Sequence, residues 1–247
     1  MAGYRRYHKE DKVSYSLGIT LTFELLKYKK EYVNKIYIHS AIKQGDTLDK
    51  LELLCKEAGI KIEYTDKIFN VLSQKENCYV IGEFVKFQGK LKQDAPHIVL
   101  VNPSNAGNMG TIMRSSLGFG INQIAIIRDA VDAFDPKVVR ASMGAIFSTD
   151  FEYFDSFNGY TGKYGSSDRE LYPFMLDAKI SLHDINPGKK FSLIFGNEAA
   201  GLPAEFASVG TSVIIPHSAD IDSLNLPIAA SIAMYEATRQ IFGNTVK

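Results

Sequence analysis

The sequence predicts an α/β fold class: a large C-terminal domain with a mostly parallel sheet, preceded by a small α/β domain. The first observation is that short apolar runs alternate with helical patterns in the second half of the chain, as in sheets covered by helices on both faces. The second is a polar stretch from Gln88 to Pro96 that carries Gly and Pro and lacks periodicity, as linkers do. The 247 residues, 45% of them hydrophobic, suffice for two domains with real cores. We therefore divide the chain into domains of residues 1–92 and 93–247.

The N-terminal domain should alternate helices and strands. Leu21, Leu25 and Tyr28 share one face of an amphipathic helix over 20–28. A second helix should start near Thr47, with Asp46 or Thr47 as its cap, and stop at Gly59. The other expected elements are strands over 35–39, 61–64 and 79–87 and a short helix over 68–73.

The C-terminal domain should have more strands than helices. A stretch rich in Gly, Ser and Tyr, residues 158–167, is expected to be an exposed loop. The expected strands cover 98–101, 123–127, 150–154, 172–176, 191–195 and 212–215, and the expected helices cover 109–117, 136–143 and 225–242.

Composition narrows the class of protein. The longest aliphatic runs, such as Ile98 to Val101, are far too short to span a bilayer, and the N-terminus leads into no apolar signal region. We expect a soluble, unexported, cytoplasmic protein that does not bind a membrane. Cys55 and Cys78 lack metal-ligand spacing and are interpreted as buried thiols.

The net charge of zero conceals a division. Residues 1–92 hold 17 Lys and Arg against 12 Asp and Glu, whereas residues 93–247 hold 11 against 16. A basic module beside an acidic one fits a nucleic-acid-binding domain joined to a catalytic domain, and ordinary surface solvation is the alternative.

Three Gly- or Pro-bearing turns directly follow apolar runs in the second half. This pattern predicts three loops at the carboxyl ends of parallel strands, where ligands bind in α/β proteins. A dinucleotide-binding enzyme is disfavoured, because Gly107 to Gly110 does not complete the G-x-G-x-x-G spacing and Asp129 follows a different order of elements. The three segments are Asn-Met-Gly-Thr-Ile-Met-Arg at 108–114, Phe-Gly-Asn-Glu-Ala-Ala-Gly-Leu at 195–202, and 215–225, from Ile-Pro to Ser-Leu-Asn.

These segments resemble the three motifs of the SpoU (TrmH-type) RNA 2'-O-ribose methyltransferases of the SPOUT class. Residues 135–147 also resemble the segment that this family carries between motifs one and two, and the match covers roughly 96–242. The resemblance implies a C-terminal α/β trefoil knot, a rare exception to the rule against threaded loops. It also implies S-adenosyl-L-methionine as cofactor, a homodimer, and RNA rather than DNA as partner. The N-terminal domain is similar in element order to a small ribosomal-protein-like RNA-binding domain that favours ribosomal RNA over tRNA.

The resemblance also assigns roles to individual residues. Arg114 would fork onto the phosphate beside the target ribose. Whether it is also the general base stays open, because a guanidinium with a pKa above about 12 accepts protons poorly. Glu198 would hydrogen-bond within the knot, with capping of the helix after Pro203 as the alternative. The implied catalytic residues are Asn108, Arg114, Glu198, Ser223 and Asn225, and the implied cofactor-binding residues are Gly196, Ile215 and Leu224.

The chain departs from the family pattern at two places. Pro216-His217-Ser218-Ala219 stands where Pro-Met-x-Gly is usual, and Ala199 stands where Gly is common. No second ligand accompanies His217, so we expect no metal site. The departures leave a non-catalytic RNA-binding protein with a degenerate knot as an alternative, beside a tRNA methyltransferase and a nicotinamide enzyme. Further candidates for contact with RNA are Tyr160 and Tyr164 in the expected loop, and Arg140 and Ser142, which could instead contact a second subunit.

Overall fold

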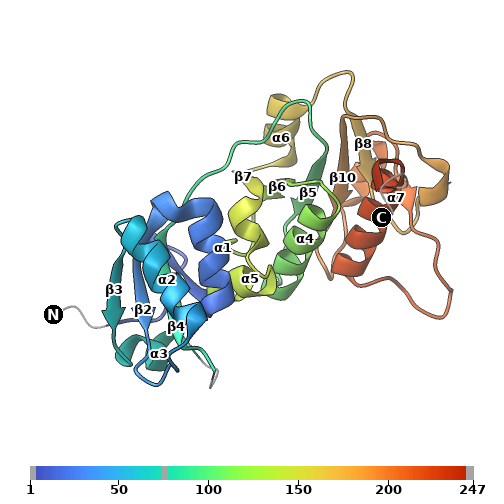
Figure 1. Cartoon of the computed structure of the whole chain (residues 1–247). Coiled ribbons are helices and arrows are strands. Elements are labelled where there is room, and N and C mark those ends of the chain that lie inside the picture. Colours follow the sequence, from blue (N-terminus) through green and yellow to red (C-terminus); the bar gives the residue numbers. More distant parts are fainter. Residues whose placement is uncertain (1–3, 74–76, 243–247) are drawn as a thin grey trace. The chain divides into compact units, whose positions relative to one another are not determined.

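The computed structural model describes residues 4–73 and 77–242 (Figure 1). The chain forms two compact units, and the boundaries differ from the expected ones. The N-terminal unit runs up to Phe87 and includes Asp132–Ser148, whereas the C-terminal unit comprises Gln88–Val131 and the chain from Thr149 onward. No helix among the described residues is long and apolar enough to cross a membrane.

The N-terminal unit contains a four-stranded sheet in the order β1-β4-β2-β3. β2 and β3 are parallel, and the other neighbours are antiparallel. Buried aliphatic residues, among them Leu26, Ile36 and Leu51, form a core between the sheet and its helices. The strands are β1 (Val13–Leu17), β2 (Val33–Ile38), β3 (Lys61–Tyr64) and β4 (Val80–Val85); the helices are α1 (Ile19–Lys29), the 3-10 turn η1 (Lys30–Tyr32), α2 (Asp46–Glu57) and α3 (Lys67–Leu72).

Several details of this unit differ from the sequence-based expectations. Tyr28 does not share the buried face of α1, since its side chain is 41% exposed. Gly45, rather than Asp46 or Thr47, occupies the N-cap of α2, whereas Gly59 ends the helix with a φ of 68° as predicted. Cys55 is buried as expected, and Cys78 is only partly buried.

Strand β1 was not predicted, because its core-facing residues are polar. Ser14 and Ser16 are fully buried while their neighbours are partly exposed, which inverts the usual apolar alternation. The Ser14 hydroxyl donates to the carbonyl of Phe134, and the Ser16 hydroxyl lies 3.0 Å from that of Thr22. These hydrogen bonds satisfy the buried hydroxyls, so the strand is stable without an apolar face.

The segment Asp132–Ser148 leaves the C-terminal half of the sequence and packs in the N-terminal unit. Its helix α5 (Pro136–Ala141) contacts β1, and its 3-10 turn η2 (Ala145–Ser148) contacts α1. The Phe147 and Phe84 rings meet edge-on at 5.3 Å. The division at 92/93 is therefore wrong for these seventeen residues. The segment buries Phe134, Val138, Val139, Ile146 and Phe147.

Two other expectations change with this assignment. Ser142 is fully buried and its hydroxyl donates to the carbonyl of Val139 at 2.7 Å, so it cannot contact RNA or a second subunit. The charge division also weakens. The N-terminal unit holds 17 Lys and Arg against 14 Asp and Glu, and the C-terminal unit holds 11 against 14.

The C-terminal unit is built on a five-stranded sheet in the order β7-β6-β5-β10-β8, in which every neighbouring pair is parallel. All residues of the three central strands are buried, as expected of a sheet covered on both faces. Helix α6 (Phe157–Tyr164) covers one face, and α4 (Ala106–Gly118) and α7 (Leu226–Phe242) lie side by side on the other (Figure 1). The strands are β5 (His97–Val101), β6 (Gln123–Ile127), β7 (Asp150–Phe154), β8 (Glu170–Pro173) and β10 (Phe191–Phe195), and β9 (Ile180–Ser181) pairs with β11 (Val213–Ile214). Short 3-10 turns η3 (Leu182–Asp184) and η4 (Ala204–Ser208) complete the unit.

The expectation of an exposed loop over 158–167 is wrong. Ser156 caps α6 by accepting a hydrogen bond from the Gly159 N–H at 3.1 Å. Tyr160 and Tyr164 are 0% and 2% exposed and pack against the central strands, so neither can reach RNA. Both rings are spaced four residues apart and face the core, a helical pattern hidden by the surrounding Gly and Ser.

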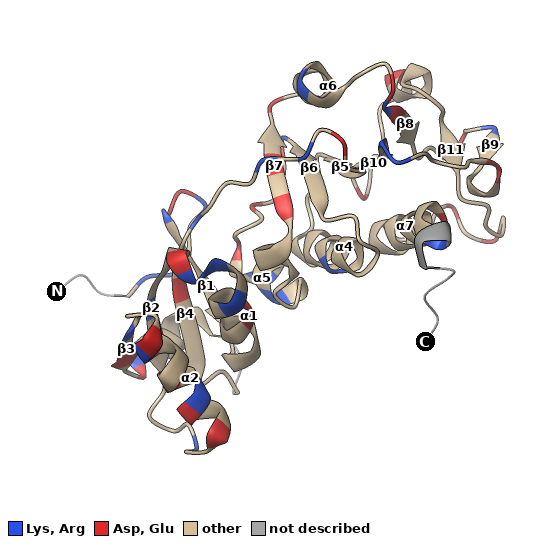
Figure 2. Cartoon of the chain, turned by 45° about the horizontal axis from the view of Figure 1, so that its top comes forward, with Lys and Arg blue, Asp and Glu red and all other residues tan. Residues whose placement is uncertain are grey.

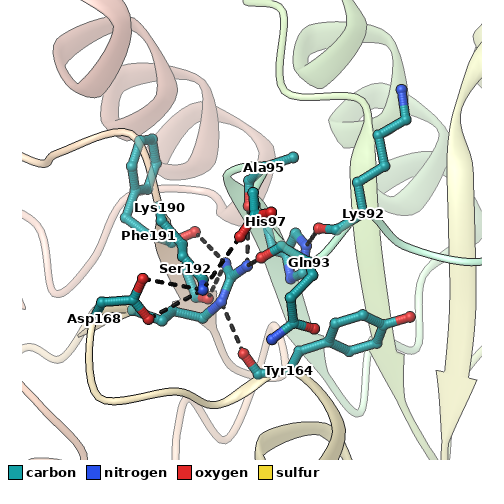
Figure 3. Close-up of polar contacts among 11 residues, drawn as sticks. Lys92, Gln93, Ala95, His97, Tyr164, Asp168, Lys190, Phe191 and Ser192 are labelled. Atoms are coloured by element: carbon teal, nitrogen blue, oxygen red, sulfur yellow. Dashed lines mark hydrogen bonds and ion pairs between the residues drawn. The ribbon is translucent and has the colours of Figure 1, made fainter.

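The expected linker is fixed to the C-terminal unit by the buried Arg169 (Figure 3). Its guanidinium donates to the carbonyls of Gln93 and Ala95 at 2.6 and 3.1 Å. It also donates to the Tyr164 and Phe191 carbonyls and to the Ser192 hydroxyl. All five guanidinium N–H groups can therefore be satisfied without a carboxylate partner.

A directional hydrogen-bond chain continues from Ser192. Tyr160 Oη lies 2.7 Å from Ser192 Oγ and 2.9 Å from His97 Nδ1. His97 Nε2 lies 2.9 Å from the Lys92 carbonyl oxygen, which can only accept, so Nε2 carries the proton and Nδ1 accepts from Tyr160. Burial, with the nearby Arg169 charge, lowers the pKa of His97 from 6.5 to about 4, which keeps the imidazole neutral.

We predict that His97 makes the protein sensitive to mild acid. A histidine with a depressed folded-state pKa contributes fully above pH 6.5 and loses its contribution as the pH falls toward 4, which amounts to about 3 kcal/mol. Urea titrations at pH 7 and pH 4 should show this loss in the wild type and a smaller one in His97→Gln, which keeps one donor and one acceptor. Equal pH dependence in the two proteins would contradict a neutral buried His97.

We also predict that deleting residues 1–92 alone yields an aggregating product. The deletion removes the partners of the apolar side chains buried by Asp132–Ser148. Replacing 132–148 with a Gly/Ser segment of equal length in the same deletion should restore a soluble, cooperatively melting C-terminal unit. Size-exclusion chromatography and thermal melting distinguish the two proteins; a well-behaved product from the simple deletion would argue against this assignment of the segment.

Candidate functional site

The second and third motif segments line one pocket, of about 210 Å³, beyond the carboxyl ends of β10 and β11. The Phe174 and Phe195 rings stack beside it, with centroids 4.6 Å apart. The predicted cofactor-binding residues Gly196, Ile215 and Leu224 all line this pocket, together with Glu198 and Ser223. The structure thus brings two loops together where the sequence pattern predicted a ligand site.

Gly196 stands at a point of very close backbone approach. A Cβ atom there would lie 2.1 Å from the carbonyl carbon of Gly201. The loop between these glycines closes on itself, because the Asn197 N–H donates to the Gly201 carbonyl at 3.2 Å and the Gly201 N–H donates to the Asn197 carbonyl at 2.9 Å. Gly201 adopts a φ of 68°, which glycine permits without strain.

Ala199 does not strain this loop. The described non-glycine residues with positive φ are Asn102 and Met143, so Ala199 has an ordinary backbone conformation. Its N–H donates to the Asn197 side-chain oxygen at 2.9 Å, an interaction that a methyl group does not disturb. The departure from glycine at this position therefore leaves the loop geometry intact.

Glu198 joins the second motif segment to the first. Its carboxylate accepts hydrogen bonds from the N–H and hydroxyl of Ser104 at 3.1 and 2.8 Å and from the Asn105 N–H at 3.1 Å. It also accepts from the Asn108 side-chain amide at 3.3 Å. Capping of the helix after Pro203 is thus wrong, since the carboxylate lies instead at the start of α4.

The charge state of Glu198 follows from these contacts. Burial raises the pKa of the carboxyl, but hydrogen bonds from its own N–H and from Ser104 and Asn105 outweigh this effect and lower the pKa overall. The group is ionised near neutral pH and lies beside the positive end of the α4 dipole. Its lone pairs are engaged by these donors, which suits it to hold a loop rather than to exchange protons.

Helix α4 begins at Ala106, one turn earlier than expected, because Asn105 caps it. The Asn105 side chain accepts from the Asn108 N–H at 3.0 Å. Arg114 lies on the exposed side of α4. It forms no hydrogen bond or ion pair with the described parts of the chain, and it does not line the pocket.

The third segment ends at the N-terminus of α7. Asn225 precedes the helix, as expected of an N-cap, and its carbonyl accepts from the Ala229 N–H at 2.9 Å. Its side chain is exposed and does not line the pocket, whereas Ser223 does. His217 lines the pocket as well, and its Nδ1 lies 2.8 Å from the Ile215 carbonyl.

The predicted catalytic residues thus fall into two groups. Asn108 contacts Glu198, and both Glu198 and Ser223 border the pocket region, whereas Arg114 and Asn225 stand apart in the single chain. Sequence reasoning missed Asn197 and Ser104, which connect the first two segments. The only available signal was the position of Asn197 between the glycine and the acid of its motif.

Comparison with known proteins agrees with the site. The model of the SpoU rRNA Methylase family matches residues 95–235, more than half of the chain. The chain belongs to this family. The match contains all three motif segments and the predicted site residues, so the resemblance seen in the sequence is confirmed.

Individual relatives are more distant. An uncharacterized tRNA/rRNA methyltransferase of Synechocystis is 32% identical over 144 residues, which are 58% of this chain and 53% of that protein. The 23S rRNA (uridine(2479)-2'-O)-methyltransferase of Streptomyces viridochromogenes is 29% identical over 162 residues, 63% of this chain and 56% of that protein. The chain therefore spans about half the length of these curated relatives.

A solved structure supports the fold. The SpoU methyltransferase AviRb from Streptomyces viridochromogenes, in complex with AdoMet, superposes with a TM-score of 0.81 at 19% identity, covering 94% of this chain and 92% of that one. At this identity the likeness shows the α/β fold with its parallel sheet.

We predict opposite results for two small changes in the pocket loop. Gly196→Ala should reduce S-adenosylmethionine affinity more than about 100-fold or prevent folding, because the added methyl group collides with the Gly201 backbone. Ala199→Gly, the matched control in the same loop, should bind within about threefold of wild type, since Ala199 is unstrained. Isothermal calorimetry measures both. Tight binding by Gly196→Ala would contradict the close approach described here.

Proposed function

We propose that this chain is an S-adenosylmethionine-dependent methyltransferase that acts on the ribose 2'-hydroxyl of RNA, with ribosomal RNA as the substrate class. The observation that carries the proposal is the Glu198 junction, which ties the start of α4 to the glycine loop of the pocket in a member of the SpoU family. The name of the Streptomyces viridochromogenes relative, a 23S rRNA 2'-O-methyltransferase, supports the choice of RNA.

The pocket fits a nucleoside cofactor in its chemistry. Aliphatic and aromatic side chains offer apolar surface to a base, and the backbone at Gly196 is bare enough for a ligand to approach closely. We assign Gly196, Ile215 and Leu224 to adenine and ribose contacts. S-adenosylmethionine, when bound, supplies an activated methyl group.

The chain's own residues then have separate tasks. We assign Arg114 to the phosphate beside the target ribose, where its planar fork fixes the nucleotide for in-line transfer. Its free guanidinium is exposed and available for this contact. Glu198 and Asn108 hold the start of the helix that carries Arg114, and Ser223 and Asn225 orient the substrate from the third segment.

We further infer a homodimer and a trefoil knot. Helix α7 exposes Ile228, Ile232 and Tyr235 at helical spacing, and neighbouring α4 exposes Leu117. Few charges interrupt these two helices (Figure 2). Such an apolar stripe favours burial against a second copy, and a knot formed by the second and third segments would hold the pocket loops together.

The N-terminal unit is proposed to bind RNA. Its excess of basic residues is small, so this assignment rests chiefly on the order of its elements, which resembles a ribosomal-protein-like module. Phosphate contacts would make the affinity fall with salt.

The decisive variant is Arg114→Ala. Methyl transfer from tritiated S-adenosylmethionine to unmodified total RNA should fall at least about 1000-fold, with cofactor affinity near wild type, because Arg114 lies on the RNA side of the site. Arg114→Lys should fail similarly, since an ammonium cannot reproduce the fork. Lys189→Ala removes an equally exposed charge near the amino end of β10 and should leave transfer unchanged. Substantial turnover by Arg114→Ala at saturating RNA would refute the assignment.

A further inference from the structure

Asn197 connects the pocket loop to the loop after β5 through both ends of its side-chain amide. Its Oδ1 accepts hydrogen bonds from the N–H groups of Ala199 and Ala200 at 2.9 and 3.2 Å. Its Nδ2 donates to the Asn102 carbonyl at 2.9 Å and lies 3.3 Å from the Ser104 hydroxyl oxygen. We propose that Asn197 is a positioning residue that transmits occupancy of the pocket to helix α4 and so to Arg114.

An amide is the side chain that this place requires. One end must accept from two backbone N–H groups, and the other must donate to a backbone carbonyl, and neutral asparagine does both. A carboxylate would keep the acceptor but set a second oxygen against the Asn102 carbonyl. It would also stand beside the Glu198 carboxylate, whose Oε2 lies 3.4 Å from Nδ2.

The two ends of Asn197 reach backbone that is conformationally specified. Asn102 follows β5 directly with a φ of 53°, a left-handed conformation uncommon outside glycine. Ser104 and Asn105 then donate to Glu198, and Asn105 caps α4. A shift of Ala199 and Ala200, which line the pocket, is therefore relayed through one side chain to the first turn of α4.

The proposal rests on the proposed function, and hydrogen–deuterium exchange separates the two. In the wild type, saturating S-adenosylmethionine should slow exchange at 104–113 as well as in the pocket loop. In Asn197→Asp the cofactor should bind within about fivefold of wild type but no longer protect 104–113. Methyl transfer to unmodified total RNA should fall about 100-fold, the usual effect of a small misplacement of a catalytic group.

Asn158→Asp makes the same chemical change on the exposed side of α6 and should behave as wild type in both measurements. If Asn197→Asp does not fold, Ser104→Ala removes only the hydroxyl on the α4 side and should weaken the relayed protection while preserving cofactor affinity.

Three outcomes would overturn the inference: a wild type that binds cofactor without protecting 104–113, an Asn197→Asp variant that keeps the protection, or one that loses cofactor affinity as severely as methyl transfer. A wild type that binds no S-adenosylmethionine would instead refute the proposed function.

Discussion

The Glu198 carboxylate is the interaction on which the arrangement of the site depends. Four donor groups from the loop after β5 and the first turn of α4 converge on it, so two loops far apart in sequence share one anion. Leaving these donors unpaired would cost about 1–3 kcal/mol for each buried group. A carboxylate committed in this way is a fixed support for a helix N-terminus, and it leaves the adjacent glycine loop free to follow a ligand.

Much of the C-terminal unit could be predicted because its signals are local. β5, β6, β7 and β10 are short apolar runs followed by turns, and Gly196 and Gly201 announce a close approach of backbone. The grouping of Gly196, Ile215 and Leu224 around one pocket followed from family motifs, and the structure brings these residues together. The doubt raised by Ala199 is removed by its ordinary backbone conformation, which takes away one motive for considering a degenerate, non-catalytic protein.

The remaining features escaped prediction because distant residues determine them. Ser14 and Ser16 face a core only because Phe134 and Thr22 supply hydrogen-bond partners, so no pattern within β1 reveals the strand. Tyr160 and Tyr164 looked like loop residues until the sheet supplied a surface for them. The linker peptide is ordered by Arg169, whose side chain comes from about 75 residues further along the chain. In each case tertiary contacts override local propensity.

The return of Asp132–Ser148 to the N-terminal unit has a consequence for the order of events during synthesis. Domains of a growing chain generally fold as units, with the N-terminal one first. Here the first unit lacks part of its core until residue 148 has been made, by which time β5 and β6 have already been translated. The two units therefore mature together on the ribosome, and the half-made protein exposes an unfinished apolar surface that chaperones could recognise.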